Sequence, residues 1–307
     1  MESPLRPGSL TVLFGAESSR IEMDDERIQA RMALPVLGPV QEETIMDRSR
    51  SATRTEGPFS LIENDDQLAG AALVRPGGGM EATTFHLYET FFSLLGGEWY
   101  PYRVWHYVPA INDPGPDGLE HYRSFNLGRS RAFETHFGQA AHGHMPAASA
   151  VGTDDDQLAL LFMAGRQSPR YIENPEQVPA YEYPGEHGPR PPSFARGTCT
   201  AQCVYVSGTA SIKGHRTVSP GDLAGQFETT LDNLRLVVGS AHGPDLEELV
   251  EHPNLRLKVY LRNRARLSEV AELMKTHLGA NETNTLYLEA AICRGDLDLE
   301  IEMTYGR

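Results

Sequence analysis

Cysteine, lysine and long apolar runs are scarce in this sequence of 307 residues. The three cysteines, Cys199, Cys203 and Cys293, are a small and odd set, which excludes a disulfide framework and fits a reducing compartment. No apolar run approaches the roughly 18 residues that a membrane-spanning helix needs. The N-terminus lacks a basic segment followed by a long apolar one, so no secretory signal is expected. We therefore expect a cytoplasmic protein with free thiols.

Positive charge is also scarce, because 27 Lys and Arg stand against 42 Asp and Glu and give a formal net charge of -15. This balance argues against nucleic acid or a membrane surface as a partner. Any anionic substrate must be captured locally. All but three of the basic residues are Arg, whose planar guanidinium suits bidentate carboxylate binding. Genomic composition explains the same bias, and more simply.

The same order of predicted strands and helices occurs twice along the chain. In the first half these are strand 69–74, helix 83–95, strand 102–108, helix 118–136 and strands 148–152 and 157–165. In the second half they are strand 203–208, helix 221–238, strand 255–261, helix 267–278 and strands 285–292 and 297–303. We therefore predict an α+β fold with two tandem β-α-β-α-β-β domains. The predicted domains are 1–164 and 197–307, joined by a connecting segment, 165–196.

Two other regions carry structural signals of their own. A strand is predicted at 10–14, and the polar residues 40–66 predict a long surface loop. The connecting segment holds seven prolines, which exclude a helix or a central strand. It also holds several tyrosines and four arginines. This mixture favours an ordered segment lining a pocket over a solvated linker.

Metal and phosphate motifs are weak. Cys199-x3-Cys203 and His142-x-His144 are the short-range clusters of metal-ligand types, and neither has a matching second pair. We therefore predict no metal. The glycines at 77–79 follow a strand and precede a helix, but they lack the spacing of a phosphate-binding loop. A flexible turn explains them better.

Nucleophile motifs are equally weak. Ser207 stands in SGTAS, which is not the G-x-S-x-G of a nucleophile elbow. His215 is either a base or a structural residue. Cys293 ends a predicted strand, where a small core residue is the simpler interpretation.

The last predicted strand, LDLEIEM at 297–303, alternates strictly. Its apolar side chains fall on one face, and Asp298, Glu300 and Glu302 fall on the other. Taken alone, this pattern favours a half-exposed strand with its carboxylates in water. The alternative is that one carboxyl group points into a cleft between the domains, where burial keeps it protonated as a general acid.

Four segments of the chain form a recognisable set: FNLGRSRAF, YIENPEQVPAYEYPGEHGPRPPSFAR, VSGTASIKGH and LEAAICRGDLDLEIE. Together they resemble the chorismatase family, whose members remove the enolpyruvyl group of chorismate as pyruvate. The resemblance covers about the last two thirds of the chain and is strongest from 170 to 215. It implies two tandem domains of the Rid-like (chorismate-mutase-like) fold, with the substrate cleft between them.

The resemblance also implies roles for individual residues. Glu300 would be the general acid, with Glu302 on the same face as the fallback. Cys293 and Ser207 occupy positions that distinguish the products of the family's branches, and we group them with the catalytic residues. The implied substrate-binding residues are Tyr183, Arg196, Arg129 or Arg131, Tyr122, Gly208 and Thr209. Ser207, Lys213 and Arg216 depart from the residues expected at their positions.

The implied chemistry fits these residue types. Chorismate carries two carboxylates, which two guanidinium groups can fix. A neutral, buried acid can protonate the methylene carbon of its vinyl ether, and no metal or organic cofactor is needed. We expect pyruvate and a hydroxybenzoate, because a cysteine at 293 resembles the hydroxybenzoate-forming branch, and we favour 3-hydroxybenzoate over 4-hydroxybenzoate. The alternatives are hydrolysis to a dihydroxycyclohexadiene carboxylate and a Rid-like module that binds a carboxylate without turnover. The sequence leaves the oligomeric state open.

Overall fold

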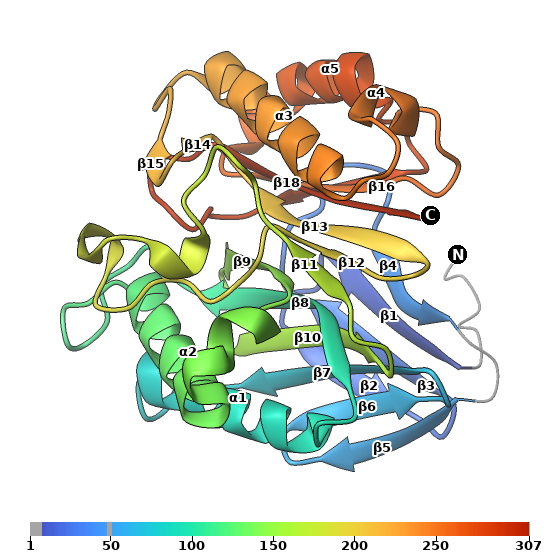
Figure 1. The fold of residues 1–307 in the computed structure, drawn as a ribbon, viewed down its shortest axis with the longest axis vertical. Helices are drawn as coiled ribbons and strands as arrows, with labels where there is room; N and C mark the ends of the chain where they lie inside the picture. The colour runs from blue at the N-terminus through green and yellow to red at the C-terminus, as the bar shows by residue number, and fades with distance from the viewer. Residues whose placement is uncertain (1–7, 48–50, 307) are drawn as a thin grey trace.

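Two six-stranded sheets with the same internal order form the frame of the protein (Figure 1). The computed structural model describes residues 8–47 and 51–306. The first sheet runs through β5 (Ala52–Glu56), β6 (Phe59–Glu63), β7 (Gln67–Val74), β10 (Leu158–Gly165), β8 (Tyr100–Pro109) and β9 (Ala147–Thr153). The second runs through β11 (Arg170–Ile172), β12 (Gly197–Cys199), β13 (Cys203–Thr209), β18 (Leu299–Gly306), β16 (Arg256–Leu261) and β17 (Thr285–Glu289).

Each sheet contains one copy of the predicted β-α-β-α-β-β unit. The connecting helices are α1 (Met80–Leu95) and α2 (His121–Phe137) in the first copy and α3 (Leu223–Ser240) and α5 (Leu267–Leu278) in the second, where the short α4 (Leu246–Leu249) follows α3. In both copies the last strand lies between the first and the second strand, and the second and third strands are parallel. The predicted α+β class and tandem order are therefore confirmed.

Local sequence signals set the ends of several helices. Asp222 precedes α3, and its carboxylate accepts the Gly225 N–H at 3.2 Å, which caps the helix. Gly96 and Gly279 follow α1 and α5 in the left-handed conformation, which glycine adopts without strain. Short 3-10 turns lie at Gly138–His144, Ala180–Glu182, Gly185–His187 and Arg264–Arg266.

The N-terminal region adds a third sheet, which the sequence revealed only in part. Its strands, in spatial order, are β2 (Arg20–Met23), β3 (Arg27–Met32), β1 (Ser9–Phe14) and β4 (Glu42–Asp47). The predicted strand at 10–14 is confirmed as β1. The predicted surface loop at 40–66 is wrong, because β4, β5 and β6 occupy it; residues 48–50 lie outside the described part. β4 and β5 are edge strands, whose polar, partly exposed residues resemble a loop in composition.

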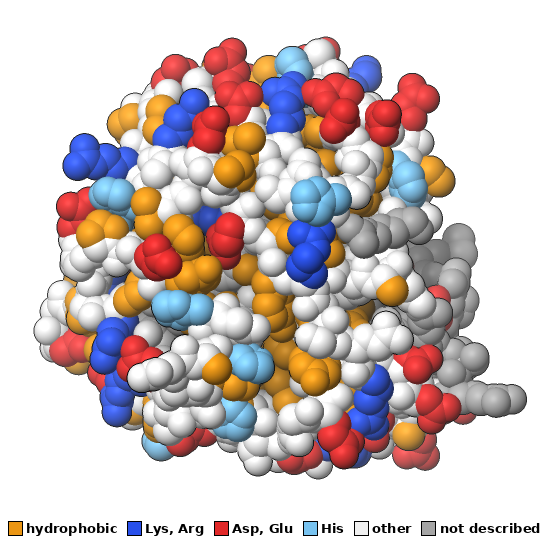
Figure 2. Space-filling model, in the orientation of Figure 1, with side chains coloured by type: hydrophobic (Ala, Val, Ile, Leu, Met, Phe, Trp, Pro, Cys, Tyr) orange, Lys and Arg blue, Asp and Glu red, His pale blue; other side chains and the backbone are white. Residues whose placement is uncertain are grey.

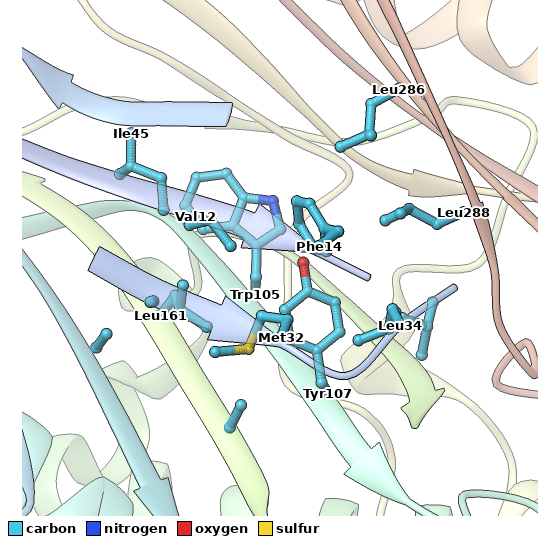
Figure 3. Packing of buried hydrophobic residues seen from close by; sticks show 14 of the residues in the cluster. Val12, Phe14, Met32, Leu34, Ile45, Trp105, Tyr107, Leu161, Leu286 and Leu288 are labelled. Carbon is cyan, nitrogen blue, oxygen red and sulfur yellow. The ribbon is translucent and has the colours of Figure 1, made fainter. Parts of the chain in front are cut away.

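The three sheets enclose a common core (Figure 3). The N-terminal sheet contributes Val12, Phe14 and Met32, which pack against Trp105 and Tyr107 of β8 in the first sheet. Residues of β16 and β17 close this core from the second sheet. The inner faces of both six-stranded sheets are therefore buried. Any side chain of β18 that points toward the inner face is buried as well.

Helices cover the outer faces of both sheets, so the layers run helix, sheet, core, sheet, helix (Figure 1). Phe91 and Phe92 of α1 pack on the first sheet, and Phe227 and Leu234 of α3 pack on the second. No helix within the described residues is long and apolar enough to span a membrane. Figure 2 shows many Asp and Glu side chains over α3, α4 and α5, so much of the negative charge on this face lies on that outer layer.

The two sheets meet where β9, an edge strand of the first sheet, approaches β13 of the second. Gly208 N–H donates to the Ser149 hydroxyl at 2.9 Å, and Ala148 N–H donates to the Ser207 hydroxyl at 2.9 Å. The connecting segment and a small hairpin, β14 (Ile212–Lys213) with β15 (Arg216–Thr217), lie next to this junction (Figure 1). Together, the sheet junction, the connecting segment and the hairpin form a pocket.

Candidate active site

A pocket of about 590 Å³ lies at the junction of the two sheets. Its wall is built from α2, β9, the end of β13, the connecting segment and β18. Seven residues of the connecting segment contribute to it: Gln177, Tyr183, Glu186, His187, Pro192, Phe194 and Arg196. A pocket of this size between two domains is a common kind of small-molecule site.

The pocket brings together eight of the ten residues that the sequence singled out. They are Tyr122, Arg129, Tyr183, Arg196, Gly208, Thr209, Cys293 and Glu300. Arg131 and Ser207 do not line it. The residues in the pocket come from positions up to 178 apart in the chain, so the fold rather than sequence proximity assembles them.

Glu300 is the buried acid of the pocket. It lies on β18 with only 4% of its surface exposed. Burial, and next the negative charge of Glu302, raise the pKa of Glu300 to about 8, although Arg103 and Arg196 act in the opposite direction. Its Oε1 atom has no hydrogen-bond partner among the described residues. At neutral pH this carboxyl group is therefore mostly protonated and is free to donate its proton to a ligand.

Glycine at position 208 is what lets Glu300 occupy this place. A Cβ atom at Gly208 would lie 1.8 Å from Oε1 of Glu300 and 2.9 Å from the Ser149 hydroxyl. Any side chain larger than hydrogen would therefore displace the carboxyl group. The pairing of β13 with β18 also shifts register between Val206 and Thr209, next to this contact.

Glu302 lies two residues further along the same face of β18 but in the opposite protonation state. Arg103 contacts its carboxylate at 2.9 Å and Lys258 at 3.4 Å. The Trp105 indole and the Tyr260 hydroxyl each donate to it at 2.9 Å. Burial alone would raise its pKa, but Arg103 and Lys258, together with hydrogen bonds from Ser149 and Trp105, lower it to about 2. Glu302 is therefore ionised, and its carboxylate is held by ion pairs and hydrogen bonds. Glu300 is the better proton donor of the two.

The alternating pattern alone predicts a half-exposed strand with its carboxylates in water, and this prediction is wrong for Glu300 and Glu302. Glu300 and Glu302 are 4% and 5% exposed, and only Asp298 is partly exposed. The reason is that β18 is a central strand, paired with β13 on one side and β16 on the other, and the other sheets cover its inner face. The alternation of polar and apolar residues cannot show whether the polar face of a strand is exposed to solvent or covered by another part of the protein.

Two buried arginines in the pocket have unused hydrogen-bond donors. Arg129, on α2, is 2% exposed, and its Nε and Nη2 atoms have no hydrogen-bond partner among the described residues. Arg196 is 6% exposed; its Nη2 donates to the Tyr183 hydroxyl at 2.7 Å, while its Nε has no such partner. Burying unpaired guanidinium donors is costly. Their placement therefore favours an anionic ligand, such as one that carries carboxylates.

A partly buried carboxyl group, that of Glu173, lies near Arg196. Oε2 of Glu173 lies 4.0 Å from Nε of Arg196, at the outer limit of an ion pair. Burial raises the pKa of Glu173 to about 7, and the Arg196 charge offsets this only in part. Because Glu173 is only partly ionised at neutral pH, it leaves much of the positive charge of Arg196 available to a ligand.

Arg131 does not belong to the site, which corrects one of the two arginine assignments on α2. Its side chain is exposed, pairs with Glu81 of α1 and lies over the Phe85 ring. The helical period explains the difference. Tyr122, Asn126 and Arg129 are spaced by four and three residues and share one face of α2, whereas Arg131 lies on another. This periodicity was present in the sequence and would have selected Arg129 and added Asn126, whose side chain lines the pocket.

Ser207 has a structural position rather than a catalytic one, which corrects a second assignment. Its hydroxyl donates to the Ala195 carbonyl at 2.6 Å and accepts the Ala148 N–H at 2.9 Å, and the residue is fully buried. Both hydrogen bonds tie β13 to neighbouring segments. The hydroxyl thus fixes the sheet junction and does not face a ligand.

Cys293 and Tyr122 form a neutral part of the pocket wall. Burial, and next the proximity of Glu300, raise the pKa of the Cys293 thiol to about 12, so it is not a thiolate at neutral pH. Burial likewise raises the pKa of Tyr122, which hydrogen-bonds to Asn126 and to Cys293. Cys293 can therefore shape the pocket but is poorly suited to act as a nucleophile.

Sequence reasoning missed Arg103, which links Glu302 to Ser149 at the sheet junction. Arg103 is 1% exposed and donates to the Ser149 hydroxyl at 2.6 Å as well as contacting Glu302. Its only sequence signal is a charged residue inside the strongly apolar strand β8. Arg216, noted as a departure, lines the pocket, whereas Lys213 is exposed.

Comparison with known proteins adds evidence independent of this geometry. The family model "Chorismatase FkbO/Hyg5-like, N-terminal" matches residues 43–164. A chorismatase of Streptomyces rapamycinicus is 38% identical over 277 residues, which are 82% of this chain and 80% of the relative. A 3-hydroxybenzoate synthase of Streptomyces hygroscopicus is 33% identical over 291 residues, or 90% of this chain and 84% of the relative. The similarity thus extends through the N-terminal third, where sequence motifs alone showed little.

A solved structure resembles the whole fold. A chorismatase crystal structure superposes with a TM-score of 0.85 at 29% sequence identity, covering 96% of this chain and 92% of that chain. The N-terminal sheet and both repeats are therefore shared features of the two proteins.

Proposed function

Because this chain belongs to the chorismatase family, we propose that it cleaves chorismate into pyruvate and a hydroxybenzoate, with Glu300 as the general acid. This proposal rests on the protonation state of Glu300 and on the unpaired donors of the two arginines near it. A carboxyl group with a pKa of about 8 stands beside two buried arginines with unused donors. A module that only binds a carboxylate would need the arginines, but it would have no use for a buried, protonated acid.

Substrate binding rests on charge complementarity. Arg129 and Arg196 each present donors to the pocket, and chorismate carries two carboxylates that can accept hydrogen bonds from them. Tyr183 holds Arg196 through the 2.7 Å hydrogen bond between its hydroxyl and Nη2. The ligand then lies between α2 and the connecting segment, and its vinyl ether can approach Glu300. Fixing both carboxylates in this way removes most of the orientational freedom of the substrate.

The chemical step begins with a proton transfer to carbon. Glu300 gives its proton to the terminal methylene of the enolpyruvyl group, which leaves an oxocarbenium ion and the Glu300 carboxylate. Water or a substrate hydroxyl then attacks the oxocarbenium carbon, and its proton returns to Glu300. When water attacks, the hemiketal collapses to pyruvate and the ring diol. When the neighbouring ring hydroxyl attacks, the cyclic ketal collapses with cleavage of a ring C–O bond and loss of a ring C–H proton to the remaining ring oxygen, so pyruvate and a hydroxybenzoate form with no net water. The acid is thereby regenerated, and no metal or organic cofactor takes part. Glu302 remains ionised throughout and keeps Glu300 a proton donor at neutral pH.

Among the possible products, we favour 3-hydroxybenzoate. The 33% identity to a protein named 3-hydroxybenzoate synthase supports this isomer, and the cysteine at 293 supports a hydroxybenzoate in general. 4-Hydroxybenzoate and the dihydroxycyclohexadiene carboxylate are the alternatives, because water and a substrate hydroxyl compete for the same cation.

The first prediction concerns turnover itself. Purified protein incubated with chorismate is expected to release pyruvate, measured by coupling to lactate dehydrogenase, in equal amount to one ring product. That product is identified by chromatography against the two authentic hydroxybenzoates and the diol. Absence of pyruvate would refute the proposed activity, whereas the diol as sole product would retain it and correct the product.

The second prediction uses Arg129 and Arg131, two of the three arginines of α2, as a matched pair. Arg129→Met is expected to raise KM for chorismate roughly 10- to 100-fold, because a buried charge-assisted contact to a carboxylate is lost. Arg131→Met removes the same charge from the exposed face of the same helix and is expected to leave KM within about twofold. Equal effects of the two substitutions would show that net charge, not a direct contact, governs binding.

A further inference from the structure

Three potential metal ligands meet at the rim of the pocket and have no role in the reaction proposed above. They are Glu186 and His187 of the connecting segment and His215 of the turn between β14 and β15. One ligand atom of each lies within 4.8 Å of the others. This cluster is distinct from the cysteine and histidine pairs that the sequence suggested: His142 stacks on Tyr181, and His144 stacks on Phe137.

The spacing of the three ligand atoms matches one face of a tetrahedron around a zinc ion. Nε2 of His187 and Nδ1 of His215 are 2.9 Å apart, and a carboxylate oxygen of Glu186 lies 3.6 Å and 3.3 Å from them. Tetrahedral bonds of about 2.0 to 2.1 Å separate ligand atoms by about 3.3 Å. Seating an ion therefore replaces the hydrogen bond between the two imidazoles and requires their nitrogens to part by a few tenths of an ångström.

The backbone holds the two contributing segments in a fixed relation. Gly214 N–H donates to the Glu176 carbonyl at 3.0 Å, and Val178 N–H donates to the Gly214 carbonyl at 3.0 Å. Gly214 adopts φ of 58°, which turns the chain so that the next residue, His215, faces His187. The site is thus preorganised by main-chain contacts that do not depend on the ion.

The surroundings select the kind of cation. Arg294 donates to the His215 carbonyl at 3.0 Å, and its guanidinium lies 5.4 Å from the centre of the Tyr183 ring, so the rim already holds positive charge. A hard cation bound by charge alone is disfavoured there, because the cluster itself supplies only one carboxylate, Glu186. Two imidazoles and one carboxylate are instead a good donor set for a borderline transition metal.

We propose that Glu186, His187 and His215 form a divalent transition-metal site of the zinc class at the pocket rim. The ion joins the connecting segment to the β14–β15 hairpin and takes no part in proton transfer. It adjoins the substrate wall, because the Tyr183 ring lies 5.2 Å from the His187 ring and its hydroxyl holds Arg196. Binding is therefore expected to stabilise this wall and to raise the melting temperature.

The test is direct Zn²⁺ titration of the full chain in competition with a chromogenic chelator, without chorismate. One equivalent is expected to bind. His187→Ala and His215→Ala are each expected to weaken binding at least tenfold. The double variant H142A/H144A, which removes two histidines outside the cluster, is the matched control and is expected to bind as the unaltered protein does. Circular dichroism checks that each variant is folded.

Three results would refute the proposed metal site. The first is unchanged Zn²⁺ affinity in both His187→Ala and His215→Ala. The second is loss of binding in Cys203→Ser, which would assign the ion to thiols. The third is displacement of Zn²⁺ by a hundredfold excess of Mg²⁺, which would indicate oxygen ligands alone. Because no substrate is present, none of these results depends on the proposed activity.

Discussion

Glu300→Gln is expected to reduce pyruvate release from chorismate by about 10³-fold, within the range that a lost general acid produces. The amide has the shape of the protonated carboxyl group but cannot transfer a proton to carbon. The two arginines that hold the carboxylates are untouched, so chorismate is expected to bind with a Kd within a few-fold of that of the unaltered protein. The measurements are a coupled pyruvate assay and calorimetric titration with chorismate.

Folding is not expected to confound this result. Glu300 makes no hydrogen bond through Oε1, and its neutral form is the one stabilised in the pocket. An isosteric neutral amide therefore replaces a neutral acid. Asp298→Asn, one residue before β18 begins and partly exposed, is the matched control and should retain full activity. Undiminished turnover by Glu300→Gln would show that another group supplies the proton.

Glu302→Gln is expected to act at a distance, by lowering the pKa of Glu300. The Glu302 charge raises that pKa, second only to burial, while Arg103 lowers it. Without the Glu302 charge, Arg103 is left uncompensated beside Glu300, and a shift of about one unit or more downward follows. Because the reaction needs the protonated acid, activity is lost as pH rises through the pKa of Glu300. The alkaline fall, expected near pH 8 in the unaltered protein, should move to lower pH.

The full pH dependence of kcat/KM separates this role from a purely structural one. Loss of Glu302 leaves Arg103 buried without its ion partner, which is expected to cost about 3 kcal/mol of folding free energy. Reduced stability scales the rate at every pH, whereas an altered pKa moves the midpoint and leaves acidic-side activity intact. Asp298→Asn again serves as control and should show no shift. A midpoint unchanged in Glu302→Gln would mean that Glu302 does not tune the acid.

The fold was predictable where hydrophobic periodicity is strong and the elements lie in the middle of the sheets. The helix predicted at 267–278 coincides with α5, and the duplicated order emerged from spacing alone. The N-terminal sheet was largely missed, because β4 and β5 are edge strands with few buried side chains. Edge strands keep their polar residues in water, so their composition resembles that of a loop.

The candidate site, too, was predictable from the sequence only in part. Motifs pointed to Glu300 and Arg196, which both line the pocket, but the choice between Arg129 and Arg131 required the helical period of α2. The protonation states of Glu300 and Glu302 could not be predicted from sequence, because they depend on Arg103 of β8 and Lys258 of β16. Contacts between strands so distant in the chain are set by sheet order, and no local pattern encodes them.

The central claim is that the fold keeps Glu300 protonated and Glu302 ionised at neutral pH. The most direct test is NMR titration of protein labelled with ¹³C at the glutamate side-chain carboxyl, with the two resonances assigned by their loss in Glu300→Gln and Glu302→Gln. The account predicts a Glu300 midpoint of about 8 and a Glu302 midpoint of about 2. A Glu300 resonance that titrates at or below the ordinary value of 4.5 would contradict it.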